Sequence, residues 1–252
     1  MATTAPPAAS RVSPLSPRAT TTRRRLALTK MDLFAGLPER DLTILEARLP
    51  IAFWPRGAEI PDPLTRADHI FLVREGRIAL FERTAPGHEI MVTLLESGSV
   101  FSTLGTASLP NVASLASSAV TPLPSAALEG LIARYPRLGC NLAAMLSELA
   151  RTLGETVALV SEMKVEDRLR ARLHQLSERF GVAAPEGVRL ELDLTHAQWA
   201  SLVGASREAV TTAFGKLRTQ GAIQVDGRSI TISWDVVRGH ESRADAVEPT
   251  AA

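Results

Sequence analysis

The segment from Thr195 to Ile232 limits the possible folds more than any other part of the chain. Thr195-His196-Ala197-Gln198 has the form of a capping box, in which two side chains satisfy the free amides at a helix start. Gly204 supplies a residue that tolerates the positive φ of a tight turn, and Ser206 is a favourable N-cap for a second helix. The second helix is predicted to bury an apolar stripe made of Val210, Ala213, Phe214 and Leu217.

A hairpin pattern follows this second helix. Gly221 can end the helix in the left-handed conformation, and Ile223 and Val225 then alternate with polar residues. Asp226-Gly227 favours a type I′ turn, after which the apolar alternation resumes. Helix, tight turn, helix and hairpin in this order predict a winged helix-turn-helix, a unit that places its second helix in the major groove of DNA.

The polar face of the second helix carries the side chains that would read DNA. Arg207 can hold guanine O6 and N7 with two hydrogen bonds, and Glu208 can accept one from cytosine N4. The alternative is that both residues only form a solvated first turn, where a glutamate favours the helix dipole. Basic side chains on the helix and the wing would contact phosphates and position the protein. The predicted DNA-binding residues are Thr195, His196, Ser206, Arg207, Glu208, Thr211, Thr212, Lys216, Arg218 and Arg228.

The predicted DNA-binding domain, residues 165–240, is only weakly basic. It carries ten Arg or Lys against nine Asp or Glu, a net charge of +1. A DNA-binding domain is usually more basic than this. Because two copies would double the number of phosphate contacts, the modest charge favours binding as a homodimer.

Residues 135–164 are predicted to form one long helix that pairs with the same helix of a second copy. Seven residues step by 4, 3, 4, 3, 4 and 3 positions, which is an a/d seam sustained for about three heptads. A helix packed on its own sheet stays open as an alternative, because Met145 and Val157 add a second apolar flank. Cys140 is expected to be a small buried apolar residue rather than a reactive thiol. The predicted interface residues are Leu142, Leu146, Leu149, Leu153, Thr156, Val160 and Met163.

Residues 31–134 are predicted to form a sensor domain built on an antiparallel jelly roll. From Ile51 to Val120 the sequence has short apolar strands separated by turn residues such as Pro86-Gly87. Glu75-Gly76-Arg77 lies between two apolar runs and is expected to be the turn of a hairpin. The predicted fold class is therefore α+β, with the jelly roll first, the long helix next and the winged helix-turn-helix last.

The two ends of the chain differ in composition from the rest. Residues 1–30 are rich in Ala, Thr, Ser and Pro and carry five Arg and one Lys but no acid, so this basic tail is expected to be disordered. Three roles stay open for it: an organellar transit peptide, a basic arm on DNA phosphates, or no particular function. Residues 241–252 are also expected to be disordered.

Composition excludes several classes of protein. No apolar run approaches the length needed to span a membrane, so no membrane contact is expected. The single cysteine, Cys140, excludes a disulfide framework and a cysteine-bound iron–sulfur cluster. A reducing cytoplasm is the default location for such a chain.

The order of a short helix, a jelly roll, a long dimer helix and a winged helix resembles the Crp/Fnr family of bacterial transcription regulators. The resemblance covers roughly residues 33 to 237. It is closest at Gly204-Ala205-Ser206-Arg207-Glu208-Ala209-Val210, which is similar to the start of the family's recognition helix. Two further segments are also similar to segments of family members: Phe34-Ala35-Gly36-Leu37-Pro38 and Phe71-Leu72-Val73-Arg74-Glu75-Gly76.

The resemblance implies how the protein would act. It implies a homodimer on a two-fold symmetric operator in double-stranded DNA, base reading by Arg207 and Glu208, and RNA polymerase as a further partner. Thr212 stands where many members carry an arginine that also reads the site, which leaves the operator sequence open.

Members of the family that bind cyclic AMP carry a phosphate-binding cassette, a Gly-Glu-Leu turn followed about ten residues later by an Arg-Ser pair. The resemblance places Ser102-Thr103-Leu104 at the turn, Ala113-Ser114 at the pair, and Leu153-Gly154 where the long helix would contact the base. The glutamate for the ribose and the arginine for the phosphate are both missing. Since a buried charge without its partner costs about 3–5 kcal/mol, cyclic AMP is not expected to bind in the family's manner. The identity of any other effector stays open.

An enzymatic or metal-binding role is the alternative to a regulator. Haem would need an axial ligand, for which His69 and His88 are the candidates, but a lone histidine is more often an ordinary surface or core residue. A cupin-like metal enzyme needs clustered histidine and glutamate ligands, and Gly87-His88-Glu89 supplies one histidine with no second one two residues on. We therefore expect that the protein binds no metal and no cofactor, and that it is not an enzyme.

Overall fold

The structure is a computed structural model that describes residues 26–59, 68–85, 88–103, 111–162, 164–227 and 229–238. Both predicted tails fall largely outside this range, as do Leu104, Met163 and Arg228. Thr156 and Val160 lie in a described helix, but their side chains are not described. Among the described helices, none combines the length and the apolar character of a membrane-spanning segment.

The N-terminal elements form a small helical layer beside the sheets. It consists of the short 3-10 helices η1 (Leu28–Lys30) and η2 (Asp32–Phe34) and of helix α1 (Glu39–Arg48). A buried arginine fixes this layer in place: the Nε of Arg74 donates to the Leu26 carbonyl at 2.7 Å, and its guanidinium pairs with Glu46. Glu46 in turn accepts a hydrogen bond from the Leu28 amide at 2.8 Å. One ion pair therefore joins the helical layer to the strand that carries Arg74.

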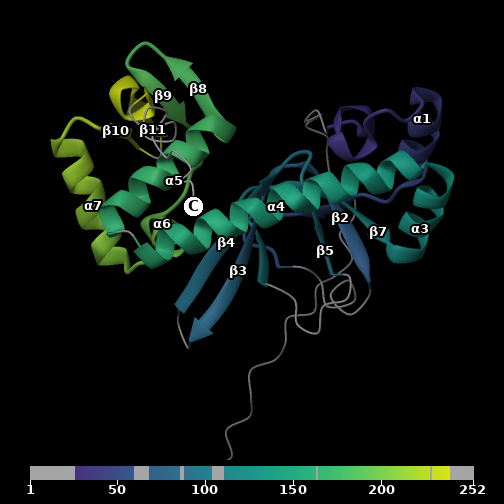
Figure 1. The fold of residues 1–252 in the computed structure, drawn as a ribbon, viewed down its shortest axis with the longest axis horizontal. Coiled ribbons are helices and arrows are strands. Elements are labelled where there is room, and N and C mark those ends of the chain that lie inside the picture. Colours follow the sequence, from purple (N-terminus) through teal and green to yellow (C-terminus); the bar gives the residue numbers. More distant parts are fainter. Residues whose placement is uncertain are drawn as a thin grey trace, which may run out of the picture.

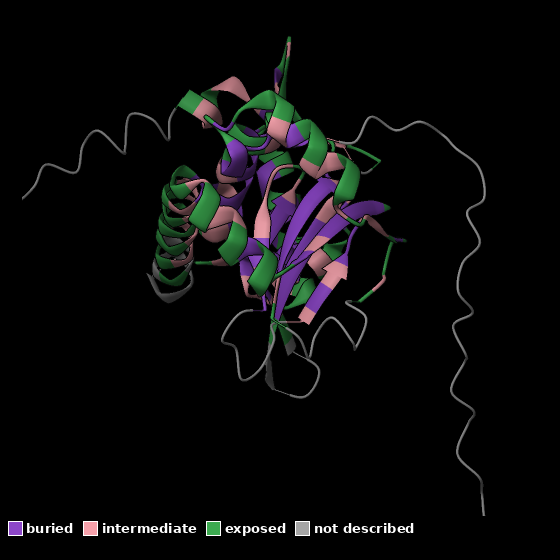
Figure 2. Ribbon diagram, turned by 90° about the vertical axis from the view of Figure 1, so that its right-hand side faces the viewer, coloured by how far each residue is buried: buried purple, intermediate pink, exposed green. Residues whose placement is uncertain are grey.

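Two antiparallel sheets form the predicted sandwich (Figure 1). In the first sheet the order is β1 (Ala52–Trp54), β7 (Ser118–Pro124), β2 (His69–Glu75) and β5 (Val100–Ser102). In the second it is β4 (His88–Glu96), β3 (Arg77–Ala85) and β6 (Asn111–Ser114). Buried residues gather along these strands, whereas the helices carry exposed residues on their outer faces (Figure 2). The predicted jelly roll is confirmed.

The expected hairpin at Glu75-Gly76-Arg77 is wrong. β2 pairs with β5 and β7, whereas β3 pairs with β4 and β6, so these consecutive strands belong to different sheets. Gly76 has φ +93°, and a Cβ added there would lie 2.2 Å from the Ser118 Oγ. The chain therefore crosses between the two sheets at a point that only glycine fits, where sequence spacing alone suggested a turn.

The predicted long helix is α4 (Pro136–Glu162), which follows α3 (Ser125–Arg134) after a break at Tyr135. It runs across the molecule from α3 to the C-terminal elements (Figure 1). Leu142 and Met145 pack against the N-terminal helical layer, and Leu138 is fully buried there. Cys140 is exposed, which corrects the expectation of a buried thiol, because its side of α4 has no described element packed over it.

The C-terminal elements form the predicted winged helix. α5 (Val165–Phe180) leads into β8 (Gly181–Ala184) and β9 (Gly187–Leu190), and the pair of helices α6 (His196–Val203) and α7 (Arg207–Thr219) follows. The wing consists of β10 (Ile223–Asp226) and β11 (Ser229–Ser233), in a sheet of order β10-β11-β9-β8. The wing hairpin closes at the Asp226–Ser229 pair, one residue later than predicted.

The sandwich and the winged helix share one apolar core. Phe81, Met91 and Leu94 of the sandwich cluster with Trp199 and Leu202 of α6. The backbone takes part as well, since the Ser201 Oγ donates to the Glu89 carbonyl of β4 at 2.7 Å. Helix α6 is therefore held on one side by the sandwich and on the other by α7.

Candidate DNA-binding interface

The turn between α6 and α7 has the local chemistry that the sequence predicts. The Thr195 side chain accepts a hydrogen bond from the Gln198 amide at 3.2 Å, while the Gln198 side chain accepts one from the Thr195 amide at 2.9 Å. Gly204 ends α6 in the left-handed conformation, at φ 65°. The Ser206 Oγ then caps α7 by accepting from the Ala209 amide at 3.1 Å. Both caps are confirmed.

The outward face of α7 is open to solvent. The exposed residues on it include Arg207, Glu208, Thr212 and Arg218, and within the described part of the chain their side chains make no hydrogen bond or ion pair. Space is also open over Gly215, where an added Cβ would meet nothing within 4 Å. The first turn of α7 therefore presents a positive and a negative side chain that are both available to a ligand.

Other predicted contact residues are already engaged inside the winged helix. The Thr195 and Ser206 hydroxyls act as helix caps, and the Thr211 Oγ1 donates to the Arg207 carbonyl at 2.8 Å. The His196 Nδ1 lies 3.1 Å from the Thr211 Oγ1. Lys216 is exposed but lies 3.7 Å from a carboxylate oxygen of Glu166 on α5. These side chains therefore hold α7 in place as well as lining its exposed surface.

The exposed apolar stripe of helix α4 overlaps the predicted seam only in part, since the two share Leu146 and Leu153. Leu142 faces the N-terminal layer, whereas Leu146 is 55% exposed and Val157 is 65% exposed. Ala143 and Ala150 are exposed as well, and Leu153 is half-buried. The exposed stripe therefore steps by 3, 4, 3 and 4 positions through Ala143, Leu146, Ala150, Leu153 and Val157. Sequence periodicity could not separate this stripe from its neighbour, because both have heptad spacing.

The two hydroxyl groups of Thr103 and Ser114, at the positions of the cyclic AMP cassette, are bonded to neighbouring segments of the sandwich. Thr103 is buried, and its Oγ1 accepts from the His69 amide at 2.9 Å. Ser114 is buried, and its hydroxyl contacts the Ala116 carbonyl at 2.6 Å and the Ser118 Oγ at 2.9 Å. Ser102 and Ala113 are half-buried in β5 and β6. On α4, Gly154 has open space around it, and Leu153 is half-buried.

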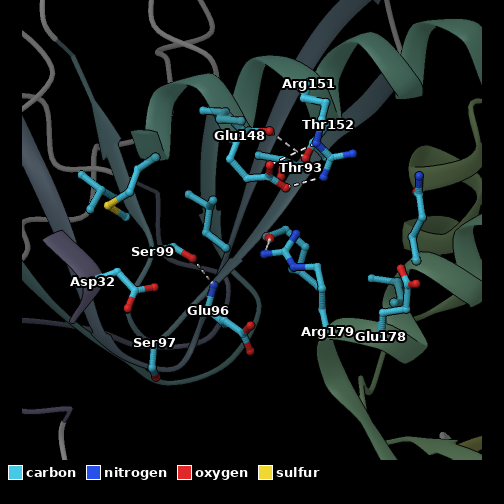
Figure 3. A pocket seen from close by; sticks show the side chains of 18 of the residues that line it. Asp32, Thr93, Glu96, Ser97, Ser99, Glu148, Arg151, Thr152, Glu178 and Arg179 are labelled. Atoms are coloured by element: carbon cyan, nitrogen blue, oxygen red, sulfur yellow. Dashed lines mark hydrogen bonds and ion pairs between the residues drawn. The ribbon is translucent and has the colours of Figure 1, made fainter. Parts of the chain in front are cut away.

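A groove of about 1330 Å³ lies between α4, α5 and the turn that joins β4 to β5 (Figure 3). Glu148 and Arg151 enter it from α4, where they form an ion pair, and Glu178 and Arg179 enter it from α5. Burial raises the pKa of the Glu96 carboxyl, although the charges of Arg179 and Arg77 oppose the shift. The sequence could not predict this groove, because the segments that form its walls are far apart in the chain and carry no recognisable motif.

Metal-binding groups do not gather in the described part of the chain. No three His, Cys, Asp or Glu side chains lie close enough there to hold a metal ion. His69 lies on β2 with its ring 5.8 Å from that of Phe71. The side chain of His88 lies outside the described residues.

Comparisons with known proteins agree with this geometry. Residues 167–233 match the Crp-like helix-turn-helix domain family. The chain is 30% identical over 186 residues to a "Global nitrogen regulator" of Synechocystis sp., covering 70% of this chain and 81% of that protein. It is 27% identical over 213 residues to a "CRP-like cAMP-activated global transcriptional regulator" of Mycobacterium tuberculosis, covering 82% of this chain and 94% of that protein.

Solved structures share the fold. A variant of CooA from Carboxydothermus hydrogenoformans aligns with a TM-score of 0.71 at 19% identity, over 90% of this chain and 98% of that one. A CRP/FNR-family transcriptional regulator from Thermus thermophilus aligns with a TM-score of 0.62 at 22% identity, over 79% of this chain and 100% of that one. Together with the relatives at the sequence level, the sandwich, the long helix and the winged helix-turn-helix establish that the chain belongs to the Crp/Fnr family of transcriptional regulators.

Proposed function

We propose that the protein acts as a homodimer that reads a two-fold symmetric operator, with one α7 helix of each copy in the major groove. The observation that carries this proposal is the first turn of α7, where Arg207 and Glu208 are exposed and free of internal partners among the described residues. Residues 165–240 form the DNA-binding domain, residues 135–164 the dimer helix and residues 31–134 the sensor domain in this proposal. Contact with RNA polymerase in the cytoplasm belongs to the same proposal.

Base reading is assigned to three side chains on α7. Arg207 donates two hydrogen bonds to a guanine, and Glu208 accepts one from the amino group of a cytosine. Thr212 lies one turn further along the exposed face, where its methyl and hydroxyl groups can contact a thymine methyl or a base edge. Lys216, Arg218 and Arg228 contact phosphates, which fix the register but carry no sequence information.

Dimerisation is assigned to the exposed stripe of α4. Two large apolar side chains of α4, Leu146 and Val157, are exposed to solvent, at 55% and 65%. The small residues Ala143 and Ala150 lie on the same stripe, before and after Leu146, and allow two helices to approach closely. Pairing of two such stripes removes this apolar surface from water, which is the main source of free energy for helix pairing.

Cyclic AMP is not the effector in this proposal. One relative is named as cyclic AMP-activated, but this chain lacks the arginine and the glutamate of the cassette. The remaining hydroxyls at those positions, on Thr103 and Ser114, are already bonded within the sandwich. A cyclic phosphate would enter without the cassette arginine to neutralise it, and that loss corresponds to about 3–5 kcal/mol.

The test combines mass measurement with selection of DNA. Multi-angle light scattering on the purified chain should give the mass of a dimer. Selection from a random duplex pool should give a motif with two-fold symmetry and half-sites about 10 base pairs apart, or a multiple of that spacing. Addition of cyclic AMP should change neither the motif nor the affinity. A monomer without sequence preference would contradict the proposal.

A further inference from the structure

We propose that His196 and Thr211 form a bracket between α6 and α7 that positions Arg207, so that His196 controls the base pair that Arg207 reads without touching DNA itself. The inference rests on the proposed function and assigns a positioning role to a residue that the sequence suggested as a DNA contact. The juxtaposition that supports it is the His196 ring, held against Thr211 on one side and Phe214 on another.

The hydrogen bonds around Thr211 decide where the proton lies on His196. The Thr211 Oγ1 donates to the Arg207 carbonyl at 2.8 Å, the usual bond of a helical threonine to the residue four positions before it. A hydroxyl has only one proton to donate. The His196 Nδ1, 3.1 Å from the same oxygen, must therefore carry the hydrogen and donate it. In the neutral ring the Nε2 is then an acceptor, and an acceptor cannot donate to a phosphate oxygen.

Aromatic contacts fix the plane of the same ring. The rings of His196 and Phe214 are stacked, with centroids 5.5 Å apart and an interplanar angle of 4°. Trp199 meets Phe214 edge-on, with centroids also 5.5 Å apart and an angle of 77°. Because Phe214 and Trp199 belong to the buried core of the winged helix, the His196 ring is anchored to a rigid layer rather than to a loop.

The bracket therefore links three points that determine how the reading helix begins. His196 is the first residue of α6, Arg207 is the first residue of α7, and Thr211 is one turn further along α7. The chain of bonds runs from the His196 Nδ1 through the Thr211 hydroxyl to the Arg207 carbonyl. Two-point contact of an arginine with guanine depends on the direction of its guanidinium, so a looser first turn reduces discrimination at that base pair.

The experiment uses the full chain and the operator selected by the wild-type protein. Arg207→Ala first identifies the base pair that Arg207 reads, as the position at which discrimination disappears. Dissociation constants are then measured on the operator and on a duplex changed at that base pair, at several salt concentrations. The variants are His196→Phe, which keeps the stacked ring but loses the donor, Thr211→Val, which loses the hydroxyl at similar volume, the double variant, and Thr211→Ser as the conservative control.

We expect His196→Phe and Thr211→Val each to reduce discrimination at that base pair by about two- to tenfold, the range that one hydrogen bond accounts for. The double variant should be no worse than either single variant, because both remove the same bracket. Thr211→Ser should retain the wild-type discrimination. The dependence of affinity on salt should stay unchanged in all of them, because no phosphate contact is lost.

Other results would contradict the proposed positioning role of His196. If His196→Phe lowers the slope of log affinity against log salt by about 0.9 and leaves discrimination unchanged, His196 is a phosphate contact. Additive losses in the double variant, or unchanged discrimination in both single variants, would also exclude it. Should His196→Phe fail to fold, His196→Gln supplies an amide donor without the ring, and it should retain most of the discrimination. If Arg207→Ala itself has no effect on selectivity, the proposed function fails, and that result is distinct from failure of the bracket alone.

Discussion

Two basic residues on α7 differ in their surroundings, and they are expected to act on DNA in different ways. Arg207 is exposed at the first turn of the helix, whereas Lys216 lies two turns on, beside Glu166 of α5. Arg207→Ala should reduce binding to the selected operator by about 1–3 kcal/mol and relax selectivity at one base pair of each half-site. Lys216→Ala should weaken binding to all sequences alike and lower the salt slope by about one. Competition binding with operator and random duplexes measures both effects.

Arg40 provides a control for this pair, because it is an exposed arginine on α1, far from α7 in the fold (Figure 1). Arg40→Ala should leave the affinity, the selectivity and the salt slope unchanged. An equal loss on every sequence after Arg207→Ala would assign Arg207 to the phosphates and contradict its role as a base reader.

Asp193 is the one residue other than glycine with a positive φ in the described part of the chain, at 49°. Its carboxylate lies 2.6 Å from the Arg56 Nη1, with the two side chains about equally exposed, at 45% for Arg56 and 44% for Asp193. An ion pair exposed to this degree contributes about 0–1 kcal/mol, whereas a left-handed conformation costs most residues about 1–2 kcal/mol. Asp193→Ala should therefore reduce the free energy of unfolding by about 1–2 kcal/mol, mainly through the backbone.

Asp193→Asn separates the two contributions, because asparagine tolerates the left-handed region and lacks the charge. In urea unfolding, Asp193→Asn and Arg56→Ala should have similar free energies of unfolding, each within about 1 kcal/mol of the wild-type value. If Asp193→Asn is as destabilised as Asp193→Ala, the ion pair rather than the backbone conformation determines the stability at this site.

The sequence predicted the structural role of single residues well where their hydrogen-bond partners lie only a few positions away. The capping box at Thr195, the turn at Gly204 and the cap at Ser206 each depend on neighbours within a few positions. The Arg56–Asp193 pair joins residues 137 positions apart, and no sequence pattern signals such a contact. Cys140 was expected to be buried because cysteine usually is, but exposure depends on which elements cover α4, and that is a tertiary property.

At the scale of elements, α4 provides a test of the proposed dimer. Leu146 is exposed in the single chain, so Leu146→Lys should leave the fold of each copy intact. In a pair of helices the same lysine would place a charge in the apolar seam, and the dimer should dissociate. Light scattering should show the mass of one chain, while the circular dichroism spectrum stays that of the wild type.

Leu142 is the matched control on the same helix. It packs against the N-terminal helical layer of its own chain. Leu142→Lys should lower the thermal stability of each copy, because a charge would enter that core. A stable dimer after Leu146→Lys would contradict the proposed interface, because Leu146 belongs to both heptad stripes of α4. A monomer with an intact fold after Leu142→Lys would show that the interface follows the stripe through Leu142 instead.

Elements were predictable where one periodicity dominates. The spacing of apolar residues predicts α7 well, because this helix buries a single stripe. In α4 two heptad stripes compete, and only the packing of the N-terminal layer decides which one stays exposed. The strand β8 was not predicted, since Gly-Val-Ala-Ala is short and its pairing partner β9 determines its conformation. β2 and β3 looked like a hairpin because the crossing at Gly76 has the composition of a turn.

At the scale of the whole molecule, the interface between the sandwich and the winged helix contains a carboxyl group with a perturbed pKa. Burial holds the pKa of Glu96 above its ordinary value, against the opposing charges of Arg179 and Arg77. The folded state therefore binds more protons than the unfolded chain between the two pKa values, and stability falls as the pH rises through that window. The stabilisation is complete below the ordinary glutamate pKa and is lost as the pH rises through the folded pKa.

Glu96→Gln should remove this dependence. Thermal unfolding between about pH 4 and pH 7 should show a smaller loss of melting temperature with rising pH in the variant than in the wild type. Glu178 lines the same groove but is more exposed, so Glu178→Gln should keep the wild-type profile. Parallel profiles for the wild type and Glu96→Gln would mean that Glu96 is ionised equally easily in the folded and unfolded states.

The sandwich also holds the segment that joins β9 to α6. The Arg77 Nη1 donates to the Glu191 carbonyl at 2.7 Å, and Arg56 binds Asp193 two residues further on. The chain thus leaves the sandwich through α4, passes through α5 and contacts the sandwich again at this segment. The winged helix is therefore attached to the sandwich at this segment as well as through α4. Rotation at the junction of α4 and α5 would therefore have to break these two guanidinium contacts together with the apolar packing of α6 on β4.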